Sequence, residues 1–294
     1  MPSPKITDRD LRVVHSIYRH KYLSASQIQT LHFPSETTRN RRLRRLIEED
    51  YVEPFSIANI PERIFRISRP GARLVASRLG VAPEDLLWTP STKTPKDYYF
   101  MRHFLRLNDV RIALELAAEE TPVSLRGFIP EYYGKKEKDG SVHKYVRDAT
   151  FGIQNPEERL AHTPDAAFCL EKEGSPALFF LEADRGTETL SNPQKGVLKM
   201  VRFYLGYLAN GGYESYSEDF KTEEPFSGFR ALIVTTSEKR LENMRSAVSS
   251  LPQQMRRGLR ALWATTFDRL SAETIFTPIW KALHEEDEKT YTIA

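Results

Sequence analysis

Cysteine and long apolar runs are both scarce in this chain. Its single cysteine, Cys169, can form neither an internal disulfide nor a cysteine-based zinc site, so a reducing cytoplasm is the expected location. No run of about 18 apolar residues occurs, which argues against a transmembrane helix and predicts no membrane partner. The first residues, MPSPKITDRD, lack the apolar segment of a signal peptide.

Several catalytic motifs are also missing. The seven histidines show no HxxxH or HExxH spacing, which disfavours a zinc enzyme. No GxxxxGKS or GxxxxGKT occurs, which argues against an NTPase or helicase motor. Phe203, Tyr204 and Tyr207 form an aromatic stripe at helical spacing, for which core packing is the expected role. A tyrosine nucleophile of the relaxase type would need a histidine cluster for its metal. Cys169 falls within a predicted strand, and we expect a buried, inert thiol.

Positive charge is concentrated at the front of the chain. Residues 1–80 contain 15 Lys and Arg against 8 Asp and Glu, whereas the remainder contains 28 against 32. The front is therefore the part suited to a polyanionic partner.

Start signals for three short helices follow one another in this basic region. The first helix begins after Thr7 and the second after Ser24, each with a capping-box partner three residues later. Pro34 ends the second helix. Ser35 opens a third helix that runs to about Glu49. Two helices separated by a tight turn predict a helix-turn-helix.

The third helix has an apolar side and a basic side. Leu43, Leu46 and Ile47 define the buried face at about 100° per residue, and Arg39 falls near it, so Arg39 is a poorer candidate for reading DNA. Arg41 and Arg45 should point outward. A helix in the major groove needs polar side chains on its outer face. The DNA contacts predicted on this face and its flanks are Thr37, Thr38, Arg41, Arg42, Arg44 and Arg45. The alternative is a solvated arginine-rich helix.

A hairpin wing is predicted after the third helix. Residues 51–57 and 63–68 have the composition of two strands with a turn over 58–61, and a closing helix spans 69–79. Arg63, Arg66 and Arg69 are predicted to contact phosphates, which position a protein on DNA without specifying sequence. Residues 1–82 are thus predicted to form a winged helix-turn-helix that binds double-stranded DNA.

Residues 83–95 are predicted to be a linker, and residues 96–294 a second domain of α+β or α/β class with a mixed sheet. We expect a long helix over 96–120, a loop or hairpin over 134–163 and a flexible excursion over 210–227. The predicted strands span 123–129, 165–170, 177–184, 229–235 and 261–266, with helices over 193–208 and 238–249. The order is helix, three strands, helix, strand.

Three carboxylates are expected at neighbouring strand ends. Asp165 starts one strand, and Glu182 and Asp184, two residues apart, end the next on one face. Such oxygen ligands suit Mg²⁺ or Mn²⁺, with Asp165 and Glu182 as the predicted metal ligands. A metal there could activate water and polarise a phosphodiester. The alternative for the two strand-end carboxylates is a salt bridge to Arg185 or a nearby lysine.

The pattern Pro164-Asp165 followed by Glu182-Ala183-Asp184 resembles the PD-(D/E)XK nuclease superfamily. More narrowly, the chain resembles the replication-relaxation family of plasmid and mobile-element proteins. The matching segments are the helix-turn-helix with Leu31-His32-Phe33-Pro34, the helix from His103 to Arg111, Thr163-Pro164-Asp165-Ala166 and Phe180-Leu181-Glu182-Ala183-Asp184-Arg185-Gly186-Thr187.

The resemblance implies a restriction-endonuclease-like second domain and a role in plasmid replication or DNA relaxation in bacteria. In nucleases of the superfamily a lysine stands two positions after the glutamate, where it orients water and stabilises charge. Asp184 takes that place here, and Lys195 or Lys199 of the next helix is the candidate replacement, so Asp165, Glu182, Asp184 and Lys199 are the catalytic candidates. An inactive nuclease fold is the alternative that this departure raises.

Three hypotheses follow. The leading one is a DNA-binding protein of a plasmid or other mobile element, in which the winged helix recognises a site and the nuclease-like domain contacts DNA or mediates assembly. The second is an active Mg²⁺-dependent endonuclease. The third is a transcriptional regulator whose second domain dimerises or binds a ligand. A homodimer is expected from the habits of such DNA binders.

Overall fold

The computed structural model describes residues 6–88, 97–136, 142–144, 146, 148–190, 192 and 194–294. The chain divides into two compact units, Met1–Ile112 and Ala113–Ala294, and we describe each by itself. Of the predicted linker 83–95, residues 89–95 lie outside the described residues. Pro83–Asp85 form a short 3-10 helix, η1.

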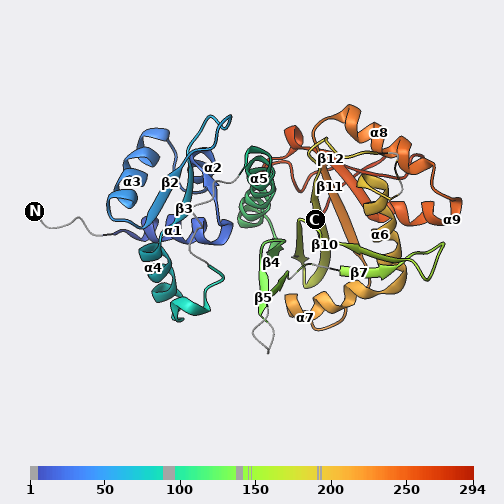
Figure 1. The fold of residues 1–294 in the computed structure, drawn as a ribbon, viewed down its shortest axis with the longest axis horizontal. Coiled ribbons are helices and arrows are strands. Elements are labelled where there is room, and N and C mark those ends of the chain that lie inside the picture. The colour runs from blue at the N-terminus through green and yellow to red at the C-terminus, as the bar shows by residue number, and fades with distance from the viewer. Residues whose placement is uncertain are drawn as a thin grey trace, which may run out of the picture. The chain divides into compact units, whose positions relative to one another are not determined.

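The front unit contains the predicted helices and hairpin in the predicted order (Figure 1). Both capping boxes are present, because the Thr7 and Ser24 side chains each accept a hydrogen bond from the backbone N–H three residues on, and their own backbone N–H donates to the side chain of that residue. Ser35 caps the third helix. The elements are α1 (Asp8–His20), β1 (Leu23–Ser24), α2 (Ala25–His32), α3 (Glu36–Glu48), β2 (Val52–Phe55), β3 (Ile64–Ile67) and α4 (Arg69–Leu79).

The wing is a small antiparallel sheet with the strand order β1-β3-β2. Its register pairs Val52 with Ile67 and Phe55 with Ile64, and β1 adds Leu23 opposite Phe65. The Glu62 carboxylate accepts hydrogen bonds from Ser26 N (2.8 Å) and Ser26 Oγ (2.9 Å), which ties the start of β3 to the first turn of α2. The predicted winged helix-turn-helix arrangement of helices and hairpin is therefore present.

The helix α5 (Tyr98–Glu120) contains the division between the two units. Its first part belongs to the front unit. Asn108 Nδ2 donates to the carbonyl of Tyr22 (2.6 Å), and Arg111 Nη1 donates to the carbonyl of Arg19 (2.8 Å). The ring centroids of Tyr22 and Phe104 are 5.1 Å apart. The front unit is thus longer than the predicted span 1–82, because α5 supplies part of its core.

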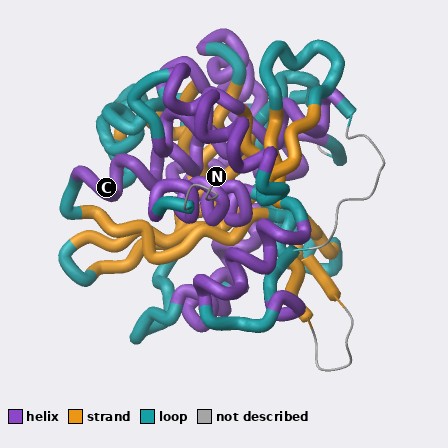
Figure 2. The backbone as a smooth tube through the Cα atoms, turned by 90° about the vertical axis from the view of Figure 1, so that its left-hand side faces the viewer, coloured by secondary structure: helices purple, strands orange, loops and turns teal. Residues whose placement is uncertain are grey.

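The second unit is built on a seven-stranded mixed sheet of order β14-β13-β12-β11-β10-β9-β4, whose paired strands run side by side in Figure 2. The neighbours of β10 are β9, antiparallel, and β11, parallel. The strands are β4 (Val123–Pro130), β9 (Ala166–Lys172), β10 (Ser175–Ala183), β11 (Phe229–Thr235), β12 (Leu262–Thr266), β13 (Trp280–Ala282) and β14 (Thr290–Tyr291). From α5 the order is helix, three sheet strands, helix, strand, as predicted.

Helices α6 (Gly196–Asn210) and α8 (Glu238–Ser249) contribute to one large apolar core against this sheet. Phe180 of β10 lies at its centre, with ring centroids 5.7 Å from Tyr204 and 5.0 Å from Phe229. Gly206 is required in α6, because a Cβ there would lie 2.5 Å from the carbonyl oxygen of Phe151. Phe203, Tyr204 and Tyr207 are buried, which confirms their predicted role in packing.

Two further hairpins occupy the predicted loop or hairpin region 134–163. One pairs β5 (Gly134–Lys136) with β6 (Val142–Lys144), and the other pairs β7 (Asp148–Phe151) with β8 (Arg159–His162). The second hairpin packs against α6, since Asn210 Nδ2 donates to Thr150 Oγ1 (3.1 Å) and to the carbonyl of Phe151 (3.2 Å).

The predicted flexible excursion over 210–227 is wrong. This polar segment forms η2 (Gly212–Ser215) and α7 (Tyr216–Phe220). Tyr216 Oη donates to the carboxylate of Asp148 (2.7 Å). The aromatic residues of the segment enter the main core and so overcome its polar composition; they are Tyr213, Tyr216, Phe220 and Phe226.

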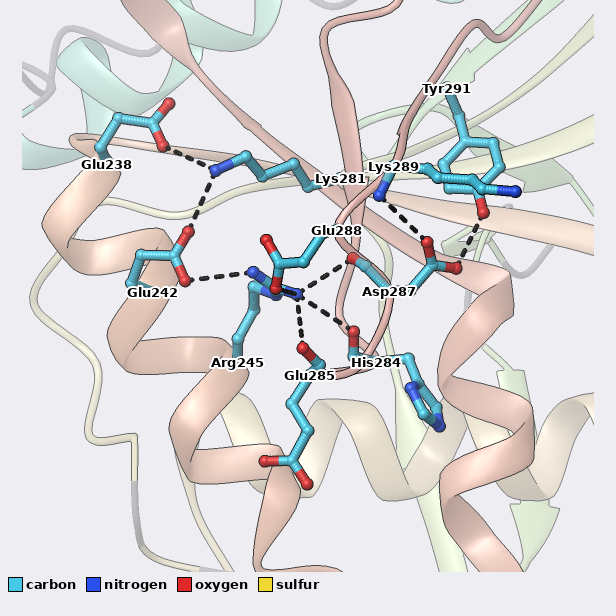
Figure 3. Close-up of polar contacts among 10 residues, drawn as sticks. All are labelled: Glu238, Glu242, Arg245, Lys281, His284, Glu285, Asp287, Glu288, Lys289 and Tyr291. Atoms are coloured by element: carbon cyan, nitrogen blue, oxygen red, sulfur yellow. Dashed lines mark hydrogen bonds and ion pairs between the residues drawn. The ribbon is translucent and has the colours of Figure 1, made fainter.

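One buried arginine fixes the last part of the chain (Figure 3). Arg245 of α8 is 4% exposed and donates to the carbonyls of His284 (3.3 Å), Glu285 (2.9 Å) and Asp287 (3.0 Å) and to the carboxylate of Glu288 (2.8 Å). These bonds satisfy backbone carbonyls in the connection between β13 and β14. The remaining short elements are α9 (Gln253–Arg256), η3 (Arg257–Ala261) and η4 (Phe267–Arg269). Among the described helices, none is long and apolar enough to cross a membrane.

Candidate functional site

The exposed face of α3 is polar and basic. Leu43 and Leu46 are buried in the front unit, and the side chains on the opposite face are exposed: Thr37, Asn40, Arg41 and Arg44. They recur three or four residues apart and therefore share one side of the helix. Arg41 is exposed as predicted. Asn40 was missed by the sequence interpretation, although its spacing from Thr37 and Arg44 was the available signal.

Two arginines of α3 have partners inside the front unit. Arg39, predicted to face the core, is 8% exposed. Its Nη1 donates to Gln29 Oε1 (2.8 Å), which joins α3 to α2. Arg42, predicted to contact DNA, pairs through Nε with Asp10 Oδ1 (2.8 Å) and through Nη2 with Asp10 Oδ2. Arg42 is consequently a poorer candidate for DNA contact than Arg41 or Arg44.

Asp10 is 1% exposed and is held by several donors. Burial would raise its pKa, but the hydrogen bonds from Arg42 and Thr7 together keep the pKa of Asp10 below its ordinary value. The ionised carboxylate is therefore part of the folded front unit, and Arg42 balances its charge.

Arg45 and Thr38 are partly buried. The Nη2 of Arg45 is buried and has no hydrogen-bond partner among the described residues. The expectation that Arg45 points outward is wrong, because Arg44 rather than Arg45 lies on the exposed face of α3. Thr38 Oγ1 accepts a hydrogen bond from the capping residue Ser35 (3.1 Å). The predicted contacts of Thr38 and Arg45 with DNA stay predictions.

The wing presents arginines of two kinds. Arg63, before β3, and Arg69, at the start of α4, are exposed. Arg66 is half-buried, pairs with Glu53 (Nε to Oε2, 2.8 Å) and lies over the Phe55 ring at 5.5 Å. Arg63 is therefore better placed than Arg66 for a phosphate contact.

Two of the three strand-end carboxylates approach each other in the second unit. Asp165, just before β9, accepts a hydrogen bond through Oδ2 from the backbone N–H of Ala183 (2.7 Å). This bond crosses the β9–β10 pair and places the Asp165 charge near Glu182, whose pKa it affects. The predicted approach of Asp165 to Glu182 is thus present.

Glu182 is 8% exposed and accepts hydrogen bonds from the second unit's core. Its Oε1 lies 2.6 Å from His162 Nε2 at the end of β8 and also accepts the hydroxyl of Tyr204 from α6. Burial raises the pKa of Glu182, and the Asp165 charge acts in the same direction. Burial alone would lower the pKa of His162, but the charge and hydrogen bond of Glu182 raise it. The two side chains form a partly buried acid–imidazole pair.

Asp184 belongs to a different set of contacts. Arg240 of α8 donates to both of its carboxylate oxygens, from Nε (3.0 Å) and Nη2 (3.1 Å), and Thr235 Oγ1 donates at 2.6 Å. This is a salt bridge, the alternative raised from the sequence, although its partner is Arg240 rather than Arg185 or a lysine. Glu182 and Asp184 both contact the α6 and α8 side of the sheet, but with separate partners.

A pocket of about 170 Å³ opens beside Glu182. Lys199 of α6 is exposed and lines it, whereas Lys195 is the N-terminal capping residue of the same helix. The lining polar side chains are His162, Glu182, Glu188 and Lys199. Of the two lysines considered, Lys199 is thus the one placed near the predicted catalytic glutamate.

The donor set does not fit the predicted Mg²⁺ or Mn²⁺ ion. In the part of the chain that the structure describes, no group of three or more His, Cys, Asp or Glu side chains could hold a metal. Asp165 Oδ2 is bonded to a backbone N–H, and Glu182 Oε1 receives two donors. Hard divalent cations need several oxygen ligands free to coordinate.

His162 and the Tyr204 hydroxyl were missed as members of this cluster. His162 falls in a segment expected to be a loop, and only its closeness in sequence to Asp165 hinted at a shared location. Tyr204 was interpreted as a packing residue, which its burial supports, but its hydroxyl also bonds Glu182. Cys169 is buried, and burial raises its thiol pKa to about 11, as expected for an inert cysteine.

Comparison with known proteins decides the family. The family described as replication-relaxation matches residues 14–221. The chain belongs to the replication-relaxation family. In this replication-relaxation protein the matched range includes α3, the wing, Asp165, Glu182 and Lys199, whereas β11 and the elements after it follow the match.

One solved structure similar to part of this replication-relaxation protein is a cysteine-to-serine mutant of MarR from E. coli, complexed with operator DNA. The identity is 19% and the TM-score 0.25, and the similarity covers 28% of this chain and 59% of that one. No curated protein matches the chain.

Proposed function

We propose that this replication-relaxation protein binds double-stranded DNA through α3 and the wing of its front unit. The observation that carries the proposal is the exposed face of α3, where Thr37, Asn40, Arg41 and Arg44 stand opposite the buried Leu43 and Leu46. A helix of this kind presents donors and acceptors to base edges, while exposed arginines beside it contact phosphates. Arg63 is the wing residue best suited to the second task.

The test removes two positive charges from α3. Replacing Arg41 and Arg44 by alanine should weaken binding to a duplex, each lost base contact costing roughly 1–3 kcal/mol and each lost phosphate contact lowering the salt dependence by about one unit of slope. Fluorescence anisotropy with labelled duplexes over a range of salt concentrations measures both quantities.

A matched control removes the same charge from another helix. Arg73 and Arg78 are exposed on α4 of the same unit. The Arg73→Ala, Arg78→Ala double variant has the same net charge as the α3 variant and should bind DNA nearly as the parent does. Equal affinity and equal salt slope for parent and α3 variant would show that α3 is not the DNA-binding helix.

Membership of the replication-relaxation family supports a proposal about the biological setting. We infer that the protein acts in DNA replication or relaxation of a plasmid or other mobile element in the cytoplasm, as a homodimer that recognises a site. Chromatin immunoprecipitation should then recover sites near the replication origin of the element that encodes it. Light scattering of the purified protein measures its molar mass and so tests whether it is a dimer. Binding confined to the protein's own promoter would instead favour the transcriptional-regulator alternative.

An endonuclease is the second candidate. The helix, three strands, helix, strand order and the presence of Lys199 beside Glu182 in one pocket favour it. The bonds that hold Asp165 and Glu182 disfavour a bound metal, so the second unit is better explained as a nuclease-like scaffold. Incubation of supercoiled and site-bearing DNA with Mg²⁺ or Mn²⁺ decides between them. Cleavage that is lost in both Asp165→Ala and Glu182→Ala would establish the enzyme.

A further inference from the structure

Another pocket, of about 390 Å³, lies in the second unit. It shares no lining residue with the pocket beside Glu182, and the part of β10 that lines it, residues 176–179, stands at the other end of that strand. Its wall is mainly apolar, with large side chains from Phe179, Phe226, Trp263 and Ile293. A pocket of this size and lining suits a small organic molecule.

Arg230 is the one charged side chain among the described residues that line this pocket. It is exposed, whereas every other residue of β11 is buried. Its Nη1 donates to the carbonyl of Phe229 (3.2 Å). Within the described residues, Nε and Nη2 have no hydrogen-bond partner, and no carboxylate pairs with the guanidinium. Burial lowers the pKa of Arg230, although Tyr291 acts against this. The guanidinium has thus lost part of its hydration without gaining a counter-ion.

The remaining edge of Arg230 has the geometry that holds a carboxylate elsewhere in this unit. Nε and Nη2 form one side of the planar guanidinium. Arg240 uses the same two nitrogens to bind both carboxylate oxygens of Asp184, at 3.0 and 3.1 Å. Arg230 can therefore pair with the carboxylate of a ligand in the same bidentate way.

Aromatic contacts hold Arg230 at the wall of the pocket. Its guanidinium carbon lies 5.1 Å from the centroid of the Trp263 ring, within the range of a cation–π contact. The Trp263 ring is itself fixed, because Nε1 donates to the carbonyl of Arg260 (2.8 Å) and the ring stacks on Tyr291 with centroids 4.9 Å apart. A cation held in this way loses little freedom when it binds an anion.

We propose that the second unit binds a small organic carboxylate in this pocket. Arg230 pairs with the carboxylate, and the apolar body of the ligand packs against Phe179, Trp263 and Ile293. The proposal does not depend on the proposed DNA binding, because every residue that it uses belongs to the second unit, whereas α3 and the wing belong to the front unit.

Isothermal titration calorimetry of the full chain tests the proposal with phenylbutyrate, a carboxylate on an aromatic body, and with its uncharged amide. The parent should bind phenylbutyrate at a single site and should bind the amide roughly tenfold more weakly, because the amide forms no charge-assisted pair with Arg230. Arg230→Gln should weaken phenylbutyrate binding by about the same factor and so remove the preference for the anion.

Two further variants separate the pocket from a general effect of charge. A Cβ on Gly228, at the wall of the pocket, would meet no atom within 4 Å, so the side chain of Gly228→Leu enters open space and should block both ligands. Arg257→Gln removes an exposed arginine that does not line this pocket and should bind phenylbutyrate as the parent does. Thermal melting of each variant shows that it is folded.

Three results would each overturn the proposal: no heat of binding in the parent, equal affinity for phenylbutyrate and its amide, or unchanged binding in folded Arg230→Gln. Binding to labelled duplexes is measured in parallel, and Arg230→Gln should bind them as the parent does. A variant that keeps phenylbutyrate binding and loses duplex binding would assign Arg230 to DNA instead. Loss of DNA binding in the α3 variant alone leaves the carboxylate site standing.

Discussion

Asp10 and Arg42 form an ion pair that ties α1 to α3 in the front unit. Asp10 is almost fully buried, whereas 19% of the Arg42 side chain is exposed. Four of the five arginines of α3 therefore divide by their partners: Arg39 and Arg42 hold the fold, and Arg41 and Arg44 face solvent. Arg45 is partly buried. The amino-acid composition counts every arginine of α3 as positive charge available to DNA. In the folded unit only the exposed arginines are available.

The Arg42→Ala variant should destabilise the front unit by about 3 kcal/mol, because it leaves a buried carboxylate without its cation. Hydrogen exchange of peptides from α1 and α3 in the full chain measures this loss. Arg12→Ala, which removes an exposed arginine from α1, should have almost no effect. Equal protection from hydrogen exchange in both variants would mean that the Asp10–Arg42 pair contributes nothing to the stability of the front unit.

The same pair predicts a pH dependence. The pKa of Asp10 is lowered in the folded state, so its contribution to stability is present above the unfolded value of about 3.9 and disappears as the pH falls through the folded value. Protection of α1 and α3 should decline below about pH 4 in the parent. In Asp10→Asn this part of the decline should be missing, and a decline of the same size would contradict the assignment.

Among the elements, α7 shows how a few aromatic residues can order a polar segment. Phe220 is buried, and its ring lies 3.0 Å from the position that a Cβ on Gly127 of β4 would take. Ring contacts continue from Phe220 to Tyr216 and Phe226. The sequence around α7 is rich in glutamate and serine, so its average polarity favoured a flexible loop, while the spacing of its aromatics was the overlooked signal.

Phe220→Ala should lower the free energy of unfolding of the second unit by roughly 3–5 kcal/mol, because it removes a large buried ring. Trp263 and Trp280 are buried in this unit and report its unfolding in a Trp88→Phe background. Glu223→Ala, an exposed change in the same segment, is the control. A loss below about 1 kcal/mol would indicate that α7 is not part of the cooperative core.

For the whole molecule, the main structural finding is that the division between units falls inside α5, after Ile112. Leu107 is buried, and Gln27 of α2 donates to the carboxylate of Asp109 (2.7 Å) and to the carbonyl of Leu105 (2.8 Å). The burial of Asp109 raises its pKa, although the bond from Gln27 opposes this. The front unit is therefore completed by residues that sequence interpretation placed in the second domain.

Fragments of the front unit test this boundary. A fragment of residues 1–112 should fold cooperatively and bind DNA, whereas a fragment of residues 1–82 should lose several kcal/mol of stability because the surface that α5 covers becomes exposed. Circular dichroism melting and amide spectra by NMR compare the two. Equal melting temperatures would show that α5 is dispensable for the front unit.

Local signals in the sequence were sufficient for much of this protein. Capping residues and Pro34 determine where several helices begin and end, because each acts on its own neighbourhood in the chain. The carboxylates Asp165 and Glu182 could also be brought together from the strand order. What only the tertiary structure decided was the partner of each charged side chain: Asp10 for Arg42, Arg240 for Asp184, and His162 with Tyr204 for Glu182. Those partners come from distant elements, and burial makes each pairing depend on packing that no local pattern records.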